Sequence, residues 1–298
     1  MNKNFDYANL ISYLEVIFPS EQDIANRVKI CQIGGMSNKN FKVELGSQEY
    51  VLRVPGIGSE GMVVRRNEEH NSFQACQMGI TPPVKYFNAD TGIKLTNYVK
   101  NAKTFDSMMV KMPENMDQIA GIFRTLHHSS VKFENEFNVF KEILNYENLL
   151  DKAGGKMYDG YESVRRKVFL LENYLDKLGV NLYPCHNDLV AENLLMAEDG
   201  TIYLIDWEYS GMNDPMWDLA ALFLENEFSK DEQDYFINSY FEGNEPSNAR
   251  KKIFAYQILM DYLWSVWTCV KEAQGDDFGS YGMDRYTRAI NNLKMIDL

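Results

Sequence analysis

The chain has 298 residues, of which 45% are hydrophobic and 24% charged, so it is long enough for two lobes and can bury substantial cores. A formal net charge of −13 argues against binding to nucleic acid or anionic membranes and favours a cationic small molecule. The four cysteines lie far apart and form no CxxC pair, which argues against a zinc site or a disulfide framework and fits a reducing compartment, the cytoplasm.

The first hundred residues predict a β-rich unit that begins with a helix. Residues 5–18 carry Asp6 and Glu15 inside an apolar pattern, so we expect an amphipathic helix here rather than a signal peptide. No apolar run in the sequence reaches the length of a membrane span, and we expect no membrane insertion. Clusters of β-branched and aromatic residues predict strands at Val28–Gln32, Phe41–Leu45, Tyr50–Val54, Val84–Phe87 and Ile93–Tyr98, with a helix at Arg65–Met78.

The remaining residues predict a mainly helical unit. Leu182–Trp207 is the exception, because short strands and loops alternate there. We therefore expect an α+β protein with two lobes, an N-terminal lobe (residues 1–100) around an antiparallel sheet and a larger, mainly helical C-terminal lobe (residues 101–298). The helices expected in the second lobe are 104–112, 114–130, 138–151, 160–178, 215–226, 231–241, 248–273 and 283–296.

The most informative motif is the segment Cys185–Asn193, whose core is H-x-D-x-x-x-x-N. Thirteen residues beyond Asn193, after a short strand-like segment, comes Asp206. Phosphoryl transfer from ATP needs a carboxylate that receives the proton of the attacking hydroxyl, and oxygen ligands for the Mg²⁺ that bridges the phosphates. We predict Asp188 as the catalytic base, Asn193 and Asp206 as the metal ligands, and His186 as a brace of the loop. Ordinary polar loop residues are the alternative, but this combination is uncommon by chance.

This loop and the segment Ile205–Ser210 (IDWEYS) resemble the aminoglycoside phosphotransferase and choline kinase superfamily, whose members share the protein-kinase-like bilobal fold. The run Leu204–Leu224 resembles the bacterial choline kinases that supply phosphocholine for surface decoration. The resemblance implies ATP, Mg²⁺ and choline as the molecules bound. It also implies that Glu208, an acid where protein kinases have glycine, is typical of choline kinases, and that Asp218 holds the catalytic loop. For Asp218, an acid favoured by a helix N-terminus is the alternative.

For the first lobe, the resemblance implies a nucleotide site. Gly34-Gly35-Met36-Ser37-Asn38 resembles the phosphate-covering loop, where small residues let backbone N–H groups approach phosphate oxygens; a plain hairpin turn is the alternative. Arg53 stands where kinases usually have a phosphate-binding lysine, and a guanidinium can hold two phosphate oxygens. Its expected partner is Glu68, with Glu69 or a solvated acidic helix face without such a pair as the alternatives. Asn97-Tyr98-Val99 would form the hinge whose backbone binds adenine.

A set of aromatic residues points to a cationic acceptor. Trp264 and Trp267 are three residues apart on one expected helix and so share a face. Aromatic faces attract quaternary ammonium, which has no N–H to donate. Such stripes are usually core, but Tyr209 follows Asp206 closely and the order W-x-x-W…F-G-x-Y resembles the choline pocket of the family. The predicted substrate-binding residues are Asp188, Glu208, Tyr209, Trp264, Trp267, Phe278 and Tyr281.

The predicted function is ATP- and Mg²⁺-dependent phosphorylation of the hydroxyl of choline. Kinases for ethanolamine or an aminoglycoside are alternatives, and Asp276, Asp277 and Asp284 leave room for a polycation. An inactive pseudokinase is a further alternative, although the three catalytic positions are all filled. The adjacent His127 and His128 lack the spacing of a metal pair, and we expect His127 to pack under the catalytic loop. The sequence contains no Walker P-loop and does not indicate an oligomeric state.

Overall fold

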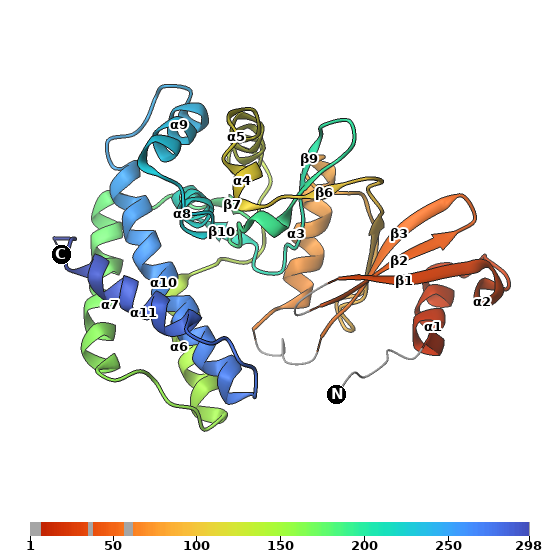
Figure 1. Cartoon of the computed structure of the whole chain (residues 1–298), viewed down its shortest axis with the longest axis horizontal. Coiled ribbons are helices and arrows are strands. Elements are labelled where there is room, and N and C mark those ends of the chain that lie inside the picture. Colours follow the sequence, from red (N-terminus) through yellow and green to blue (C-terminus); the bar gives the residue numbers. More distant parts are fainter. Residues whose placement is uncertain (1–6, 35–37, 57–61, 298) are drawn as a thin grey trace.

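The computed structural model describes residues 7–34, 38–56 and 62–297, which form two lobes side by side (Figure 1). One lobe is built around an antiparallel sheet and the other is mainly helical, so the predicted α+β, bilobal, kinase-like class is confirmed. The predicted loop residues Gly35, Met36 and Ser37 lie outside the described residues. In the described part of the chain, no helix is both long and apolar enough to cross a lipid bilayer.

The N-terminal lobe consists of α1 (Tyr7–Ile17), α2 (Ile24–Arg27), β1 (Val28–Gly34), β2 (Lys39–Leu45), β3 (Gln48–Val54), α3 (Arg65–Gln77), β4 (Val84–Phe87) and β5 (Lys94–Asn97). The strands pair in the antiparallel order β1-β2-β3-β5-β4. Side chains alternate along β2, so Phe41, Val43 and Leu45 are buried. Helix α1 packs Leu10 and Leu14 against the same apolar cluster, which closes the smaller of the two cores.

Helix α3 stands between the sheet and the helical lobe (Figure 1). Its Ala75, and Ile80 just beyond its end, are buried in the larger core of the C-terminal lobe. Its Glu68 is buried against Arg53 of β3. The same helix therefore packs on both lobes, and its position fixes how the sheet faces the helical part.

The C-terminal lobe consists of β6 (Lys103–Thr104), α4 (Ser107–Val110), α5 (Pro113–His127), α6 (Val139–Lys152), α7 (Tyr161–Leu178), β7 (Tyr183–Cys185), η1 (Ala191–Asn193), β8 (Leu194–Met196), β9 (Ile202–Leu204), β10 (Gly211–Asn213), α8 (Pro215–Glu225), α9 (Lys230–Phe241), α10 (Ala249–Ala273) and α11 (Tyr281–Leu293). Helix α10 contacts α6, α7, α8 and α11 and runs through the larger core. Its Leu259, Leu263 and Val266 are fully buried there.

The predicted helix over residues 104–112 is wrong in part. Lys103–Thr104 pairs with β8 as a strand, and the helix that follows is the single turn Ser107–Val110. Asp106 sets its start, because the Asp106 carboxylate accepts hydrogen bonds from the N–H groups of Met108 and Met109. The sequence analysis also missed β10, which pairs with β7 and closes the base of the catalytic loop.

Candidate active site

A cavity of about 1210 Å³ lies between the two lobes and is lined by residues of both. Its walls come from the sheet, from the loop after β7, from the segment after β9 and from α10 with the loop that follows it. Of the predicted site residues that the structure describes, Glu68 is buried behind the wall. The others line the cavity: Asn38, Arg53, Asn97, Tyr98, Val99, Asp188, Asn193, Asp206, Glu208, Tyr209, Trp264, Trp267, Phe278 and Tyr281.

The loop that follows β7 brings Asp188 and Asn193 to the cavity. Its backbone turns at Asn187, which has a φ of 68°, a left-handed conformation that is uncommon outside glycine. The Asn187 side chain is held at both ends, since Nδ2 donates to Tyr209 O at 3.0 Å and Oδ1 accepts from Asn213 Nδ2 at 2.9 Å. Asn193 Nδ2 donates to Asp188 O at 2.8 Å and to Asp188 Oδ2 at 3.2 Å. The amide nitrogen of Asn193 is thus occupied, and its oxygen is the atom suited to bind a cation.

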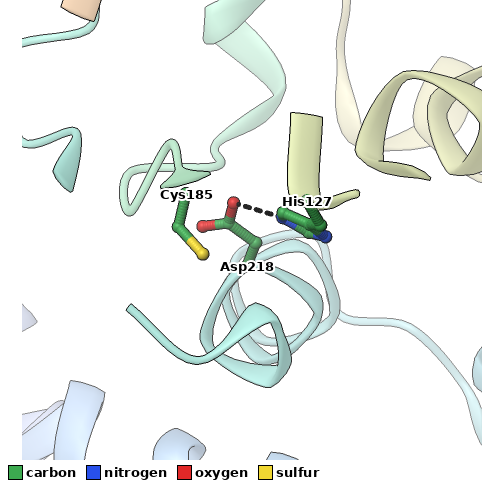
Figure 2. A group of neighbouring side chains, drawn as sticks. All are labelled: His127, Cys185 and Asp218. Atoms are coloured by element: carbon green, nitrogen blue, oxygen red, sulfur yellow. Dashed lines mark hydrogen bonds and ion pairs between the residues drawn. The ribbon is translucent and has the colours of Figure 1, made fainter. Parts of the chain in front are cut away.

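Asp218, on α8, holds this loop through its carboxylate, which also contacts His127 (Figure 2). Its fully buried carboxylate accepts hydrogen bonds from the backbone N–H groups of His186 at 2.9 Å and Asn187 at 2.8 Å. It also lies 3.0 Å from His127 Nε2, while His127 Nδ1 lies 2.9 Å from the Tyr240 hydroxyl. A buried carboxyl group therefore fixes the backbone next to Asp188, and the expected contacts of Asp218 and His127 with the loop region are confirmed.

His127, Cys185 and Asp218 place ligand atoms within 4.8 Å of one another, as a metal site would (Figure 2). Each of these atoms already has a protein partner, however, and Cys185 Sγ donates to Asn213 O at 3.4 Å. Burial raises the pKa of the Cys185 thiol well above its usual range, so the thiol stays protonated and is not a thiolate ligand. The cluster acts as a structural latch of the loop.

The acidic segment after β9 is tied to the same loop. His186 Nε2 donates to Ile205 O at 2.8 Å and Ile205 N donates to Asn193 O at 2.9 Å, so His186 braces the loop as predicted. Asp206 has a φ of 65°, a second left-handed residue beside the cavity. Among the described residues, its buried Oδ1 has no hydrogen-bond partner. A buried carboxylate oxygen without a partner is costly unless a cation binds it.

The carboxylates in this part of the cavity repel one another. Burial, with a contribution from Asp206, raises the pKa of Asp188 to about 8 and that of Glu208 to about 7. Burial also raises the pKa of Asp206. A divalent cation would reverse these shifts, because it favours the ionised carboxylates. The oxygens of Asn193 and Asp206, with Glu208 close by, therefore fit Mg²⁺, which prefers oxygen ligands.

Arg53 and Glu68 form a buried ion pair between β3 and α3. Both terminal nitrogens of Arg53 donate to the Glu68 carboxylate, and Nη2 also donates to Gly92 O at 3.0 Å. Burial alone would raise the pKa of Glu68, but Arg53 and Lys94 lower it to about 2, so this carboxylate is ionised. Glu68, rather than Glu69, is therefore the partner of Arg53.

Glu208 connects the segment after β9 to the N-terminal lobe. Its Oε2 accepts from Arg65 Nη1 at 3.1 Å and from Asn38 Nδ2 at 3.2 Å. Arg65 Nη1 also donates to Glu68 Oε2 at 2.8 Å. Glu208 was predicted on the acceptor side, whereas these partners lie on the sheet side of the cavity.

The hinge residues follow β5 along the edge of the cavity. Asn97 N donates to Pro83 O at 2.9 Å and Tyr98 N donates to Glu49 O at 3.0 Å. These two backbone donors are already used within the protein. Val99, the third of the predicted hinge residues, also lines the cavity.

The five predicted aromatic residues form one continuous series of ring contacts. The Tyr209 and Trp264 ring centroids are 5.6 Å apart, and those of Trp264 and Trp267 are 6.0 Å apart. The Trp267 and Phe278 centroids are 5.1 Å apart, and those of Phe278 and Tyr281 are 6.3 Å apart. Four of these rings are only partly buried and Tyr281 is 39% exposed, so they line the cavity instead of filling the core.

Two neighbouring aromatic residues are part of the hydrophobic core instead. Tyr262 is fully buried and stacks on Tyr161, and Tyr286 is buried and stacks on Tyr158. Helical spacing alone did not separate these rings from the ones that line the cavity, because α10 is buried on most of its surface.

The sequence analysis missed Glu225, which lines the cavity at the end of α8. Its carboxylate pairs with Arg285, whose guanidinium lies 4.6 Å from the Tyr281 ring centroid. Among the described residues, the buried Glu225 Oε1 has no hydrogen-bond partner. An acid that ends the otherwise apolar run LAALFLE was the available signal.

A cleft between an antiparallel sheet and a helical lobe, with paired acids on one wall, defines a phosphotransferase of the kinase-like fold. Residues 30–290 match the choline/ethanolamine kinase family, and the chain belongs to this family. It is 32% identical over 273 residues to "Protein LicA" of Haemophilus influenzae, which covers 90% of this chain and 80% of that protein.

Solved structures agree with this assignment. The choline kinase LicA from Streptococcus pneumoniae is 39% identical, with a TM-score of 0.83 over 97% of this chain and 100% of that one. A structure of LicA in complex with AMP matches with 39% identity and a TM-score of 0.81 over 95% of this chain and 98% of that one. An aminoglycoside phosphotransferase, in a complex with streptomycin and ATP, is 16% identical with a TM-score of 0.65 over 96% of each chain and shows the shared fold alone.

Proposed function

We propose that this protein is a choline kinase that transfers the γ-phosphoryl group of ATP, with Mg²⁺, to the hydroxyl of choline. One observation carries the proposal: the series of aromatic rings lines the same cleft as Asp188 and the buried acids. The choline kinase of Streptococcus pneumoniae, which the chain resembles over nearly its whole length, supports it.

In this proposal Asp188 accepts the proton of the choline hydroxyl as its oxygen attacks the γ-phosphorus and the bond to the β–γ bridging oxygen breaks. Asn193 and Asp206 would hold Mg²⁺ through oxygen atoms, and Glu208 lines the same cleft. Bound Mg²⁺ neutralises charge that develops on the phosphates. Asp218 and His186 act indirectly, because they fix the loop that carries Asp188.

The nucleotide occupies the sheet side of the cleft in this proposal. Residues 1–100 form the ATP-binding lobe and residues 101–298 the catalytic and acceptor lobe. Asn38 contacts the phosphates, the hinge at Val99 meets adenine, and the Arg53–Glu68 pair orders the wall between them. We assign Glu208 to this side because its partners Arg65 and Asn38 come from the N-terminal lobe. ATP as donor places the reaction in the cytoplasm.

The acceptor occupies the aromatic side. Choline carries three methyl groups around a diffuse charge and gains from ring faces, whereas the ammonium of ethanolamine needs hydrogen-bond acceptors. The rings of Tyr209, Trp264, Trp267, Phe278 and Tyr281 suit the first cation, and the Glu225 carboxylate adds negative charge to the same wall. We therefore expect choline to be the preferred acceptor.

The test is ADP release from Mg²⁺-ATP with choline, ethanolamine or kanamycin as the acceptor, compared as kcat/KM. We expect the highest value for choline, and turnover lower by about a hundredfold or more in Asp188→Asn. An equal or higher value for ethanolamine or for kanamycin would contradict the choline assignment. The phosphotransferase assignment would be contradicted only if no alcohol acceptor were phosphorylated.

A further inference from the structure

Lys94 is a buried cation that lines the cleft at the start of β5. It is the cross-strand register partner of Arg53 on β3, so the two basic side chains leave the same face of the sheet. Glu68 lies between them, paired with Arg53 and 3.6 Å from Lys94 Nζ. Two buried cations therefore share one nearby carboxylate on the wall of the cleft.

The two cations differ in how fully their donors are used. The Arg53 guanidinium directs both terminal nitrogens to Glu68 and one of them also to Gly92 O. Lys94 Nζ donates to Ser72 Oγ at 3.1 Å, and its distance to Glu68 is within ion-pair range but beyond a normal hydrogen bond. The Lys94 ammonium can donate three hydrogen bonds, and to the described part of the chain it donates one, to Ser72 Oγ.

The surroundings of Lys94 favour an additional anion. The side chain of Lys94 is 9% exposed, and burial of its ammonium is unfavourable unless charge and hydrogen bonds compensate. Burial lowers the pKa of Lys94, and the attraction of Glu68, Asp206 and Glu208 opposes this shift. Asp206 and Glu208 line the same cleft. An ammonium that lines the same cleft as two acids is suited to a ligand that carries both anionic and cationic groups, such as a polyphosphate with a bound divalent cation.

We infer that Lys94 binds the phosphate groups of the nucleotide, while Arg53 chiefly anchors Glu68. The inference rests on the proposed kinase function, because that function supplies the phosphates. At the β3 position a kinase usually carries a phosphate-binding lysine, and here Arg53 fills it. The neighbouring strand then supplies the ammonium that β3 lacks. Sequence reasoning did not single out Lys94, since a lysine in a short strand is usually solvated.

The first experiment compares Lys94→Met with Lys94→Arg, which keeps the charge, and with Lys85→Met, which removes a charge from the exposed surface of the adjacent strand β4. Calorimetry measures the Kd of Mg²⁺-ADP and of adenosine. Loss of one charge-assisted hydrogen bond should weaken Mg²⁺-ADP about tenfold or more in Lys94→Met, and adenosine less than about twofold. Lys94→Arg should recover much of the loss, and Lys85→Met should show none. Equal losses for ADP and adenosine, or no loss, would overturn the inference.

A second experiment uses the unaltered protein and covers the case in which Lys94→Met does not fold. An acyl-phosphate derivative of ATP acylates an amine that lies against its phosphates: the lysine nitrogen attacks the acyl carbon, an amide forms and ATP leaves. Peptide mapping should find the acyl group on Lys94, and excess Mg²⁺-ADP should block it. Acylation confined to other lysines would overturn the inference. Choline turnover is measured separately, so failure of the kinase proposal is distinguishable from failure of the role of Lys94.

Discussion

Trp267→Leu tests whether the aromatic wall recognises the charge of the acceptor or only its shape. The Trp267 ring contacts Trp264 and Phe278 and lines the cleft, and the Lys271 ammonium lies 6.0 Å from its centroid, within the range of a cation–π contact. Leucine keeps much of the apolar contact and removes the ring face. Loss of one cation–π contact, about 0.5–2 kcal/mol, corresponds to a decrease of about 2- to 30-fold.

The assay measures kcat/KM for choline and for its uncharged carbon isostere, 3,3-dimethylbutan-1-ol. We expect the decrease for choline alone, because only choline carries the charge that the ring face attracts. KM for ATP should stay within about twofold, since Trp267 lies on the acceptor side. Tyr235→Leu is a matched control, because this exposed ring is outside the cleft. Equal losses for choline and the isostere would refute the cation–π reasoning and leave simple apolar packing as the explanation.

Three further substitutions test the loop and the metal site. Asp188→Asn should lower turnover about a hundredfold or more, the scale of losing a general base, with Mg²⁺-ADP affinity nearly unchanged in calorimetry; a loss below about threefold would mean that another group accepts the proton. Asp206→Ala should weaken Mg²⁺-dependent ATP binding and abolish activity, and normal activity at low Mg²⁺ would contradict the ligand assignment. Asp218→Asn replaces one accepting oxygen with a donor, so urea denaturation should show a loss of about 1–3 kcal/mol; an unchanged midpoint would argue against the latch seen in the structure.

The parts of the site that could be predicted consist of residues that lie close together in the sequence. Asp188 and Asn193 belong to one loop, and Asp206 follows after a single hairpin, so spacing alone brought them together. The aromatic set was predicted because Trp264 and Trp267 lie one helical turn apart.

Other features depend on partners that are remote in sequence. Glu68 is the partner of Arg53, and Glu69 is not, because of the side of α3 that faces β3. Helix periodicity in the sequence does not predict which side that is. The strand β10 has three residues and exists through its pairing with β7, so propensity carries almost no signal. Lys94 is buried only because the sheet, α3 and the acidic segment all converge on it.

The charge of the cleft explains how an acidic chain can bind ATP. A protein with a formal net charge of −13 repels a polyphosphate at long range, so attraction must be local. The basic groups near these acids are outnumbered by them, so the protein alone leaves no surplus positive charge for the phosphates. Mg²⁺ supplies that surplus at the acids, so in our proposal the metal is part of the nucleotide site as well as of the chemistry. The basic residues are Arg53, Arg65 and Lys94, and the acidic residues are Glu68, Asp188, Asp206 and Glu208.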